Sequence, residues 1–302
     1  MRNHMQQIRY MIEGMRPHQW IKNLFVFAAP IFGKQLFVPS KFFAVCVTFA
    51  AFCLLSSAVY LLNDLTDLEE DRQHPSKRRR PLPSGRLRPG FAQGGAAVVG
   101  VVSLGALFLL APWQAGMVAV VYLATNVLYS VFLKHVVILD VMFIAAGFIF
   151  RILAGSFATG VRPSYWLLLC TLNVSLFLGF VKRRAEITTL GDAAPNHRSV
   201  LAHYSPAFLD QMISIVTGAT LVCYILYAVD PQTETRMLVA TVPFVMYGLF
   251  RYLYLSYHLS QGGNPTKVVL LDKAFLLNVG LWGLACIIIM YYHETIRGWL
   301  PV

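Results

Sequence analysis

Residues 63–85 read NDLTDLEEDRQHPSKRRRPLPSG, from Asn63 to Gly85, and directly follow an apolar run that extends from Phe42 to Leu62. An α-helix continued through this stretch, at about 100° per residue, would place four oxygen-bearing side chains on one face: Asn63, Asp64, Asp67 and Asp71. Carboxylates that share a helix face repel one another unless a cation neutralises them. The stretch therefore predicts a charged site at the end of an apolar helix.

The residues that follow these acids are basic, which suits a site for a metal-bound phosphate. Carboxylate and amide oxygens suit Mg²⁺, and adjacent Arg or Lys side chains neutralise the remaining phosphate charge. The basic side chains of this segment are Arg72, Lys77, Arg78, Arg79 and Arg80. An ordinary charged helix end with a solvated loop is the alternative. Both signs of charge at the end of an apolar run favour the metal–phosphate site.

The chain as a whole is too apolar for a soluble globular protein. Its 302 residues are 57% hydrophobic and 13% charged, and the mean hydropathy is +0.60. The formal net charge of +11 is explained by anionic lipid and by the charge asymmetry of membrane loops. We therefore expect an all-α polytopic membrane protein with no nucleic-acid partner.

A membrane-spanning helix needs about 20 predominantly apolar residues, and the sequence contains nine such stretches. They are residues 19–38, 42–64, 92–111, 114–133, 138–158, 164–182, 207–229, 237–256 and 273–292. No connection is long enough for a separate soluble domain. We expect one transmembrane catalytic domain over residues 1–302, with polar active-site loops at about 63–90 and 182–206.

The distribution of Lys and Arg predicts the orientation of these spans. If the N-terminus is cytoplasmic, far more basic residues lie in cytoplasmic loops than in outer loops, as the positive-inside rule requires. The acidic stretch then lies at the cytoplasmic mouth of the helical bundle. The sequence does not fix an oligomeric state and leaves a homo-oligomer open.

Arg151 lies deep within the stretch 138–158. A charged group at such a depth is costly and usually faces the bundle interior, a cavity or a partner. At 3.6 residues per turn, Asp140, Gly147 and Gly155 lie near Arg151 on the same helix face, which is small and polar enough to line a pocket. This favours a functional role for Arg151 over a structural ion pair.

Other polar positions have two interpretations each. Lys22 is either an anchor at the membrane surface or a phosphate ligand. Tyr129 is a weaker candidate for the site, since a membrane Tyr commonly bonds to a neighbouring helix. Lys182 and Glu186 are spaced i, i+4 and form either a surface ion pair or a phosphate ligand beside a metal-binding or orienting carboxylate. Spacing alone does not decide between these interpretations.

The motif Asn63-Asp64-x-x-Asp67-x-x-x-Asp71 resembles the first acidic motif of the UbiA superfamily of intramembrane prenyltransferases, which follows the second of nine transmembrane helices. Within that superfamily, the sequence is most similar to the decaprenyl-phosphate phosphoribosyltransferase branch. The stretches that carry the resemblance are residues 16–23, 63–81, 140–155 and 182–186, the last reading Lys182-Arg183-x-x-Glu186. The resemblance covers nearly the whole chain and implies a UbiA-type bundle in the bacterial inner membrane.

The resemblance implies transfer of 5-phosphoribosyl from 5-phosphoribosyl 1-diphosphate to a polyprenyl phosphate of the decaprenyl type, with release of diphosphate and with Mg²⁺ as cofactor. The metal and diphosphate set would be Asn63, Asp64, Asp67 and Asp71, of which the three acids are catalytic. The substrate-binding set would be Lys22, Arg72, Lys77, Arg80, Tyr129, Arg151, Lys182, Arg183 and Glu186. No general base is needed, because the acceptor phosphate is already ionised at neutral pH. The lipid product would supply cell-wall precursors.

Two alternatives involve different chemistry. An aromatic prenyltransferase would transfer an isoprenoid from its diphosphate to a ring such as 4-hydroxybenzoate. Family members of that kind have a second DxxxD motif after the sixth span, where this chain has only Glu186 and, after a gap, Asp192. A transporter would have its substrate site near the membrane midplane, and only Arg151 supports one. We therefore expect a phosphoribosyltransferase.

Overall fold

The structure is a computed structural model that describes residues 4–73, 76–191, 199–230, 235–258 and 271–297. Within these ranges every regular element is a helix, which confirms the expected all-α class. The α-helices are α1 (His4–Gly14), α2 (Ala28–Phe32), α3 (Pro39–Thr66), α4 (Leu68–Gln73), α5 (Pro89–Leu110), α6 (Trp113–Val131), α7 (Leu139–Thr159), α8 (Tyr165–Leu190), α10 (Pro206–Val229), α11 (Val242–His258) and α13 (Lys273–Arg297). The 3₁₀-helices are η1 (Pro17–Phe27), η2 (Lys77–Arg79), η3 (Leu133–His135), η5 (Ser199–His203) and η6 (Arg236–Thr241).

Among the described residues, eight helical segments are long and apolar enough to cross a membrane. Each coincides with one of the last eight predicted stretches. The largest difference is in α8, which continues past the predicted end at Lys182 to Leu190. The multi-pass membrane architecture expected from the sequence is confirmed.

The expected count of nine regular spans is not confirmed, because the first apolar stretch does not form a long α-helix. It forms η1, with 11 residues, followed by α2, with 5 residues. A 3₁₀-helix rises about 2.0 Å per residue and an α-helix about 1.5 Å. The two elements together therefore cover roughly 30 Å, which equals the hydrocarbon thickness of a typical bilayer.

The position of η1 is fixed by helices on two sides. Towards α7, a Cβ added at Gly155 would lie 1.8 Å from the carbonyl oxygen of Val26, so the close approach of the two backbones requires glycine. Towards α3, the Asn23 side-chain amide donates to Ser56 Oγ at 3.2 Å and to Cys53 Sγ at 3.3 Å. The irregular first segment is therefore held firmly inside the bundle.

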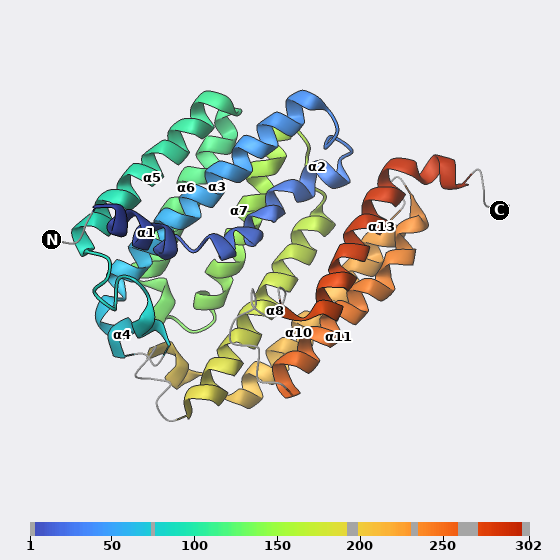
Figure 1. The fold of residues 1–302 in the computed structure, drawn as a ribbon. Coiled ribbons are helices and arrows are strands. Elements are labelled where there is room, and N and C mark those ends of the chain that lie inside the picture. The colour runs from blue at the N-terminus through green and yellow to red at the C-terminus, as the bar shows by residue number, and fades with distance from the viewer. Residues whose placement is uncertain (1–3, 74–75, 192–198, 231–234, 259–270, 298–302) are drawn as a thin grey trace.

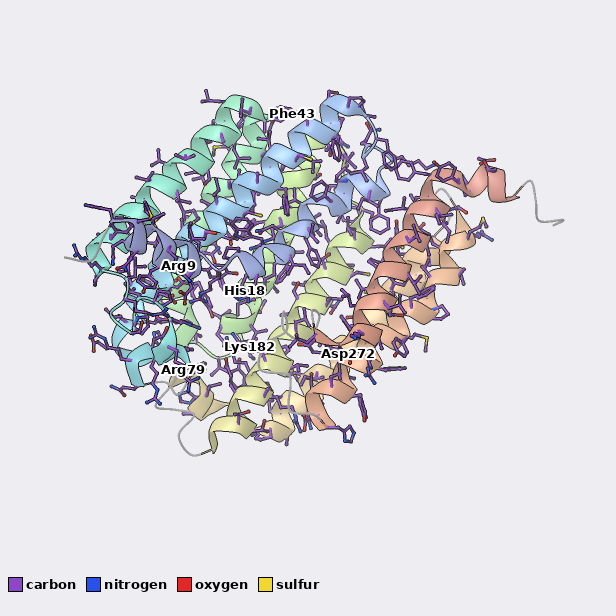
Figure 2. All side chains as sticks on the ribbon, viewed as in Figure 1. Arg9, His18, Phe43, Arg79, Lys182 and Asp272 are labelled. Atoms are coloured by element: carbon purple, nitrogen blue, oxygen red, sulfur yellow. The ribbon has the colours of Figure 1, made fainter. Side chains whose placement is uncertain are left out.

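The helices form a single bundle whose neighbours are visible in Figure 1. α3 packs on α5, α7 packs on both α6 and α8, and α8 packs on α10. α4 and η2 lie at the end of the bundle where α3 ends and α5 begins, and we call this the site end. In Figure 2, Arg79 and Lys182 lie towards the site end, whereas Phe43, near the start of α3, lies at the opposite end.

Replacing Gly155 with alanine should destabilise the protein, because the new methyl group would overlap the Val26 carbonyl. Overpacking of this kind costs about 1–3 kcal/mol, so the melting temperature of the purified protein in detergent should fall. Gly105→Ala is the matched control, since a Cβ there meets nothing within 4 Å and alanine favours the helix. Equal melting temperatures for the two variants would contradict the close approach of η1 to α7.

Candidate active site

The acidic segment begins where α3 ends. The Asp67 backbone N–H donates to the Asn63 carbonyl at 2.9 Å, and Asp67 has φ −95° and ψ 13° at the C-terminal cap of α3. α4 then starts at Leu68. The helical geometry considered for residues 63–71 is therefore interrupted at Asp67, which lies between α3 and α4.

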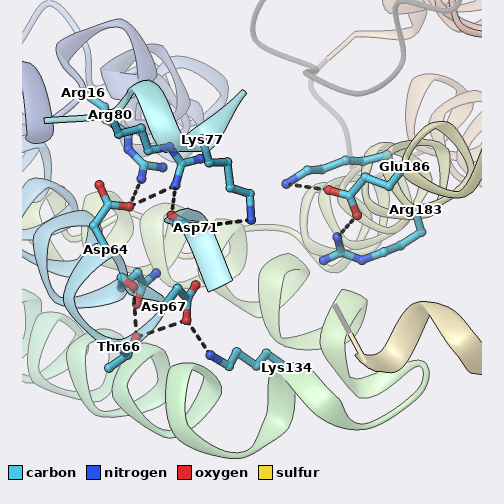
Figure 3. A network of polar contacts seen from close by, with 12 residues as sticks. Arg16, Asp64, Thr66, Asp67, Asp71, Lys77, Arg80, Lys134, Arg183 and Glu186 are labelled. Carbon is cyan, nitrogen blue, oxygen red and sulfur yellow. Dashed lines mark hydrogen bonds and ion pairs between the residues drawn. The ribbon is translucent and has the colours of Figure 1, made fainter. Parts of the chain in front are cut away.

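Asp64 and Asp71 meet at one arginine. Arg80 Nη1 donates to Asp64 Oδ1 at 3.0 Å and to Asp71 Oδ2 at 2.7 Å. Both acids are almost completely buried, with 2% and 1% of their surfaces exposed. Arg16 pairs with Asp64 Oδ1, and Lys77 Nζ lies 3.1 Å from Asp71 Oδ1. We call these five residues the acid–cation cluster (Figure 3).

The acid–cation cluster contains three cations and two carboxylates, so it has one positive charge in excess. Burial lowers the pKa of the Arg16 guanidinium, and the Asp64 charge opposes this shift. Because an arginine remains protonated in proteins, the cluster stays cationic at neutral pH. A partly buried cluster of this charge can bind an anion strongly.

The two carboxylates of the acid–cation cluster also suit a divalent cation. One nitrogen of Arg80 contacts both Asp64 and Asp71, so the two carboxylates are close enough to share a single cation. Asp71 Oδ1 is buried and, despite the nearby Lys77 ammonium, accepts no hydrogen bond from the described residues. Among all the residues that the structure describes, no three His, Cys, Asp or Glu side chains lie close enough together to form a ready metal site. The oxygen donors therefore fit Mg²⁺, while cations pair with them in this structure.

The other two members of the expected metal set contact the end of α6 and η3. Lys134 Nζ lies 2.5 Å from Asp67 Oδ1, and Ser130 donates a hydrogen bond to Asn63 Oδ1. Neither Lys134 nor Ser130 was among the predicted site residues. Each lies 67 residues from its partner, and no local pattern predicts such a contact.

A second charged group lies on α8 (Figure 3). Arg183 is fully buried; its Nε donates to Asp140 Oδ2 at 2.7 Å, and its Nη1 donates to Glu186 Oε2 at 2.6 Å. Lys182 Nζ lies 3.7 Å from Glu186 Oε1, so the predicted i, i+4 pair is present. Arg183 was predicted to bind a substrate anion, and the structure places it between the carboxylates of Asp140 and Glu186.

Tyr204 completes this group from the segment after η5. Its hydroxyl donates to Asp140 Oδ1 at 2.7 Å and accepts the Ile138 backbone N–H at 2.6 Å. Ile138 has a φ of 70°, a left-handed conformation that a β-branched residue rarely adopts. Burial and the hydrogen bond to Asp140 raise the pKa of Tyr204, so the hydroxyl stays protonated and remains a donor. Tyr204 therefore stabilises the strained start of α7.

The remaining predicted residues lie outside these two groups. Arg72 is exposed and pairs with Glu69 at 2.7 Å. Tyr129 on α6 lies close enough to Arg183 to interact with it electrostatically. Lys22 is partly exposed on η1, and Arg151 is buried on α7. The structure thus brings Asp64, Asp71, Lys77 and Arg80 together and places Arg72 at the surface.

Arg183→Gln should destabilise the fold strongly, because it leaves the Asp140 carboxylate buried without a cation; breaking such a pair costs about 3–5 kcal/mol. The neighbouring Arg184→Gln is the matched control. Arg184 pairs with Asp210, whose side chain is 41% exposed, and its guanidinium lies over the Tyr257 ring; loss of this partly exposed pair and ring contact costs about 1–2 kcal/mol. In detergent, the melting temperature of Arg183→Gln should therefore be well below that of Arg184→Gln. A fall in melting temperature for Arg183→Gln that is no larger than the fall for Arg184→Gln would contradict the structural role of Arg183.

Comparison with known proteins gives consistent matches over most of the chain. A family model described as the UbiA prenyltransferase family matches residues 24–279. A decaprenyl-phosphate phosphoribosyltransferase of Corynebacterium glutamicum is 33% identical over 290 residues, which cover 93% of this chain and 86% of that protein. The Mycobacterium tuberculosis protein of the same name is 32% identical over 277 residues, or 90% of this chain and 91% of that protein.

Solved structures share the fold. A UbiA homologue from Archaeoglobus fulgidus, bound to GPP and Mg²⁺, superposes with a TM-score of 0.73 at 13% identity, covering 93% of this chain and 99% of that chain. A digeranylgeranylglyceryl phosphate synthase structure gives a TM-score of 0.61 at 18% identity, covering 93% and 98%. These likenesses establish the expected UbiA-type bundle.

Proposed function

The chain belongs to the UbiA prenyltransferase family, and we propose on this basis that it transfers 5-phosphoribosyl from 5-phosphoribosyl 1-diphosphate to a polyprenyl phosphate and releases diphosphate. The acid–cation cluster is the observation that carries the proposal. Its excess positive charge suits the polyanionic donor, and its buried carboxylates suit a metal. Two relatives that match about nine-tenths of this chain are named for this activity.

The donor diphosphate binds at the acid–cation cluster. Arg80 and Lys77 point their charged groups at Asp64 and Asp71, and both cations would move to the diphosphate when Mg²⁺ occupies the carboxylates. Mg²⁺ would be held by Asp64 and Asp71, with Asn63 and Asp67 as further oxygen ligands, and would supply charge stabilisation for the leaving diphosphate. Arg72, at the rim of the site, would meet the donor first.

The acceptor approaches from the membrane with its phosphate towards the site end. An oxygen of this phosphate forms the bond to ribose C1 while the bond from C1 to the diphosphate oxygen breaks. The chain needs only to bind and orient the two anions and to stabilise charge on the leaving group. This region is bordered by Lys182, Tyr129 and the Arg183–Glu186 pair. Lys182 would bind substrate phosphate. Arg183 and Glu186 would orient the surrounding helices.

An aromatic prenyltransferase is the less favoured function. It would require a second carboxylate group in the loop after α8 for a prenyl diphosphate. Glu186 pairs with Arg183 and Lys182, and Asp192 lies outside the described residues. Assaying a prenyl diphosphate with 4-hydroxybenzoate in parallel separates the two functions.

Purified protein in detergent should transfer label from phosphoribosyl diphosphate to a polyprenyl phosphate, and EDTA should abolish the transfer. Asp67→Asn should reduce turnover by at least about a hundredfold, since Asp67 would help to hold the Mg²⁺ that stabilises the leaving diphosphate, and loss of such stabilisation typically has an effect of this size. Glu70→Gln is the matched control, because Glu70 is an exposed acid of the same segment. Full activity of Asp67→Asn, or transfer only of a prenyl group to the aromatic acid, would refute the proposal.

The site end should face the cytoplasm, where basic segments are retained. In a background without native cysteines, a membrane-impermeant maleimide applied to spheroplasts should label Arg162→Cys but not Arg78→Cys. Both positions are exposed, and Arg162 lies in the α7–α8 connection, at the opposite end of α8 from Lys182. Labelling of Arg78→Cys alone would reverse the orientation.

A further inference from the structure

We propose that Lys22 and Arg151 form a binding site for a phosphate monoester inside the bundle, separate from the acid–cation cluster. This inference deepens the proposed function and rests on it for the identity of the substrates. Both substrates carry a phosphate monoester: the acceptor as its headgroup and the donor as its 5-phosphate. The site would hold one of these groups while the diphosphate lies at the acid–cation cluster.

Arg151 is a buried charge that the described residues do not neutralise. Its side chain donates from Nε to Asn23 Oδ1 at 2.7 Å, from Nη1 to the Gly147 carbonyl at 2.6 Å and from Nη2 to the Tyr122 hydroxyl at 3.1 Å. All three acceptors are uncharged, and no carboxylate of the described chain forms an ion pair with Arg151. These contacts use three of the five N–H donors of a guanidinium, so two remain for a ligand.

The partners of Arg151 hold the guanidinium in place before a ligand arrives. Asn23 is itself fixed by hydrogen bonds to Ser56 and Cys53, and the guanidinium carbon lies 5.0 Å from the centre of the Tyr122 ring. Arg151 is the thirteenth residue of α7, so it lies about 18 Å along the axis from the first residue of that helix. A fixed charge at such a depth is costly and usually serves a ligand or a partner.

Lys22 adds a second charge to the same region. Among the described residues it has no hydrogen-bond or ion-pair partner, and the charges that act on its ammonium group are those of Arg151 and Arg16. Like charges repel, so an anion between Lys22 and Arg151 would stabilise both. Lys22 is only partly exposed, and its three N–H donors form no hydrogen bond within the described residues, so an anion would satisfy them.

The distance along η1 separates this site from the acid–cation cluster. Lys22 lies six residues after Arg16, which corresponds to about 12 Å of a 3₁₀-helix. Two anionic groups can therefore bind at the two sites together, with the reacting ribose between them. Two cations also match the double negative charge of a phosphate monoester.

The test measures binding without donor, metal or turnover. The probes are ribose 5-phosphate and geranyl phosphate, with ribose and geraniol as uncharged controls, and the readout is calorimetric titration of the full chain in detergent. Lys22→Gln should weaken the affinity for at least one phosphate about tenfold to a hundredfold, the usual effect of losing a charged hydrogen bond. Lys22→Arg should retain most of it. Lys273→Gln, which removes an exposed lysine at the start of α13, should change nothing.

Each outcome has a defined meaning. A loss confined to geranyl phosphate assigns the site to the acceptor, and a loss confined to ribose 5-phosphate assigns it to the donor. Affinities of Lys22→Gln within twofold of the original, or no binding of either phosphate by the unmodified protein, overturn the inference. These results do not depend on the transfer assay, so the site can fail while the proposed function stands. Because Lys22 forms no hydrogen bond or ion pair with the described residues, its variants test the site even if Arg151→Gln does not fold.

Discussion

The neutralisation of two buried carboxylates constrains the whole site end. A buried charge without a partner costs several kcal/mol, and Arg80 meets this need for Asp64 and Asp71 through a single nitrogen. Because the two acids belong to α3 and α4 and Arg80 follows η2, the shared guanidinium fixes three segments against one another. Arg16 joins Asp64 and brings the start of η1 to the same point. The start of η1 is therefore held by Asp64, in addition to the contacts of η1 with α3 and α7.

The spanning helices could be predicted from the sequence because the bilayer imposes a length and a composition on each of them. Eight of nine expected stretches correspond to long apolar helices. The first stretch has the same composition, but tertiary contacts determine its conformation: Gly155 admits the Val26 carbonyl, and Asn23 bonds to α3. Hydrophobicity measures whether a segment can enter a membrane, and it does not distinguish an α-helix from a 3₁₀-helix.

The site was predictable where its parts are close in sequence. The acids and the basic run lie within a few turns of each other, and the structure joins Asp71 to Lys77 and Arg80. The contacts of Arg16 with Asp64 and of Lys134 with Asp67 join distant segments and have no local signature. The sequence shows that Arg183 is charged but does not show that it is buried, so Arg183 was expected to face a substrate anion. Its partner Asp140 is 43 residues away in the sequence. Helical spacing predicted the Lys182–Glu186 pair because both residues lie on one helix.

Binding of the donor at the acid–cation cluster can be observed directly. Its most direct test is an experimental structure of the protein with Mg²⁺ and phosphoribosyl diphosphate, determined under conditions that prevent turnover. Binding at the acid–cation cluster predicts a metal ion beside Asp64 and Asp71, with the diphosphate contacted by Arg80 and Lys77. A donor bound elsewhere, with Arg80 still bridging Asp64 and Asp71, would contradict it.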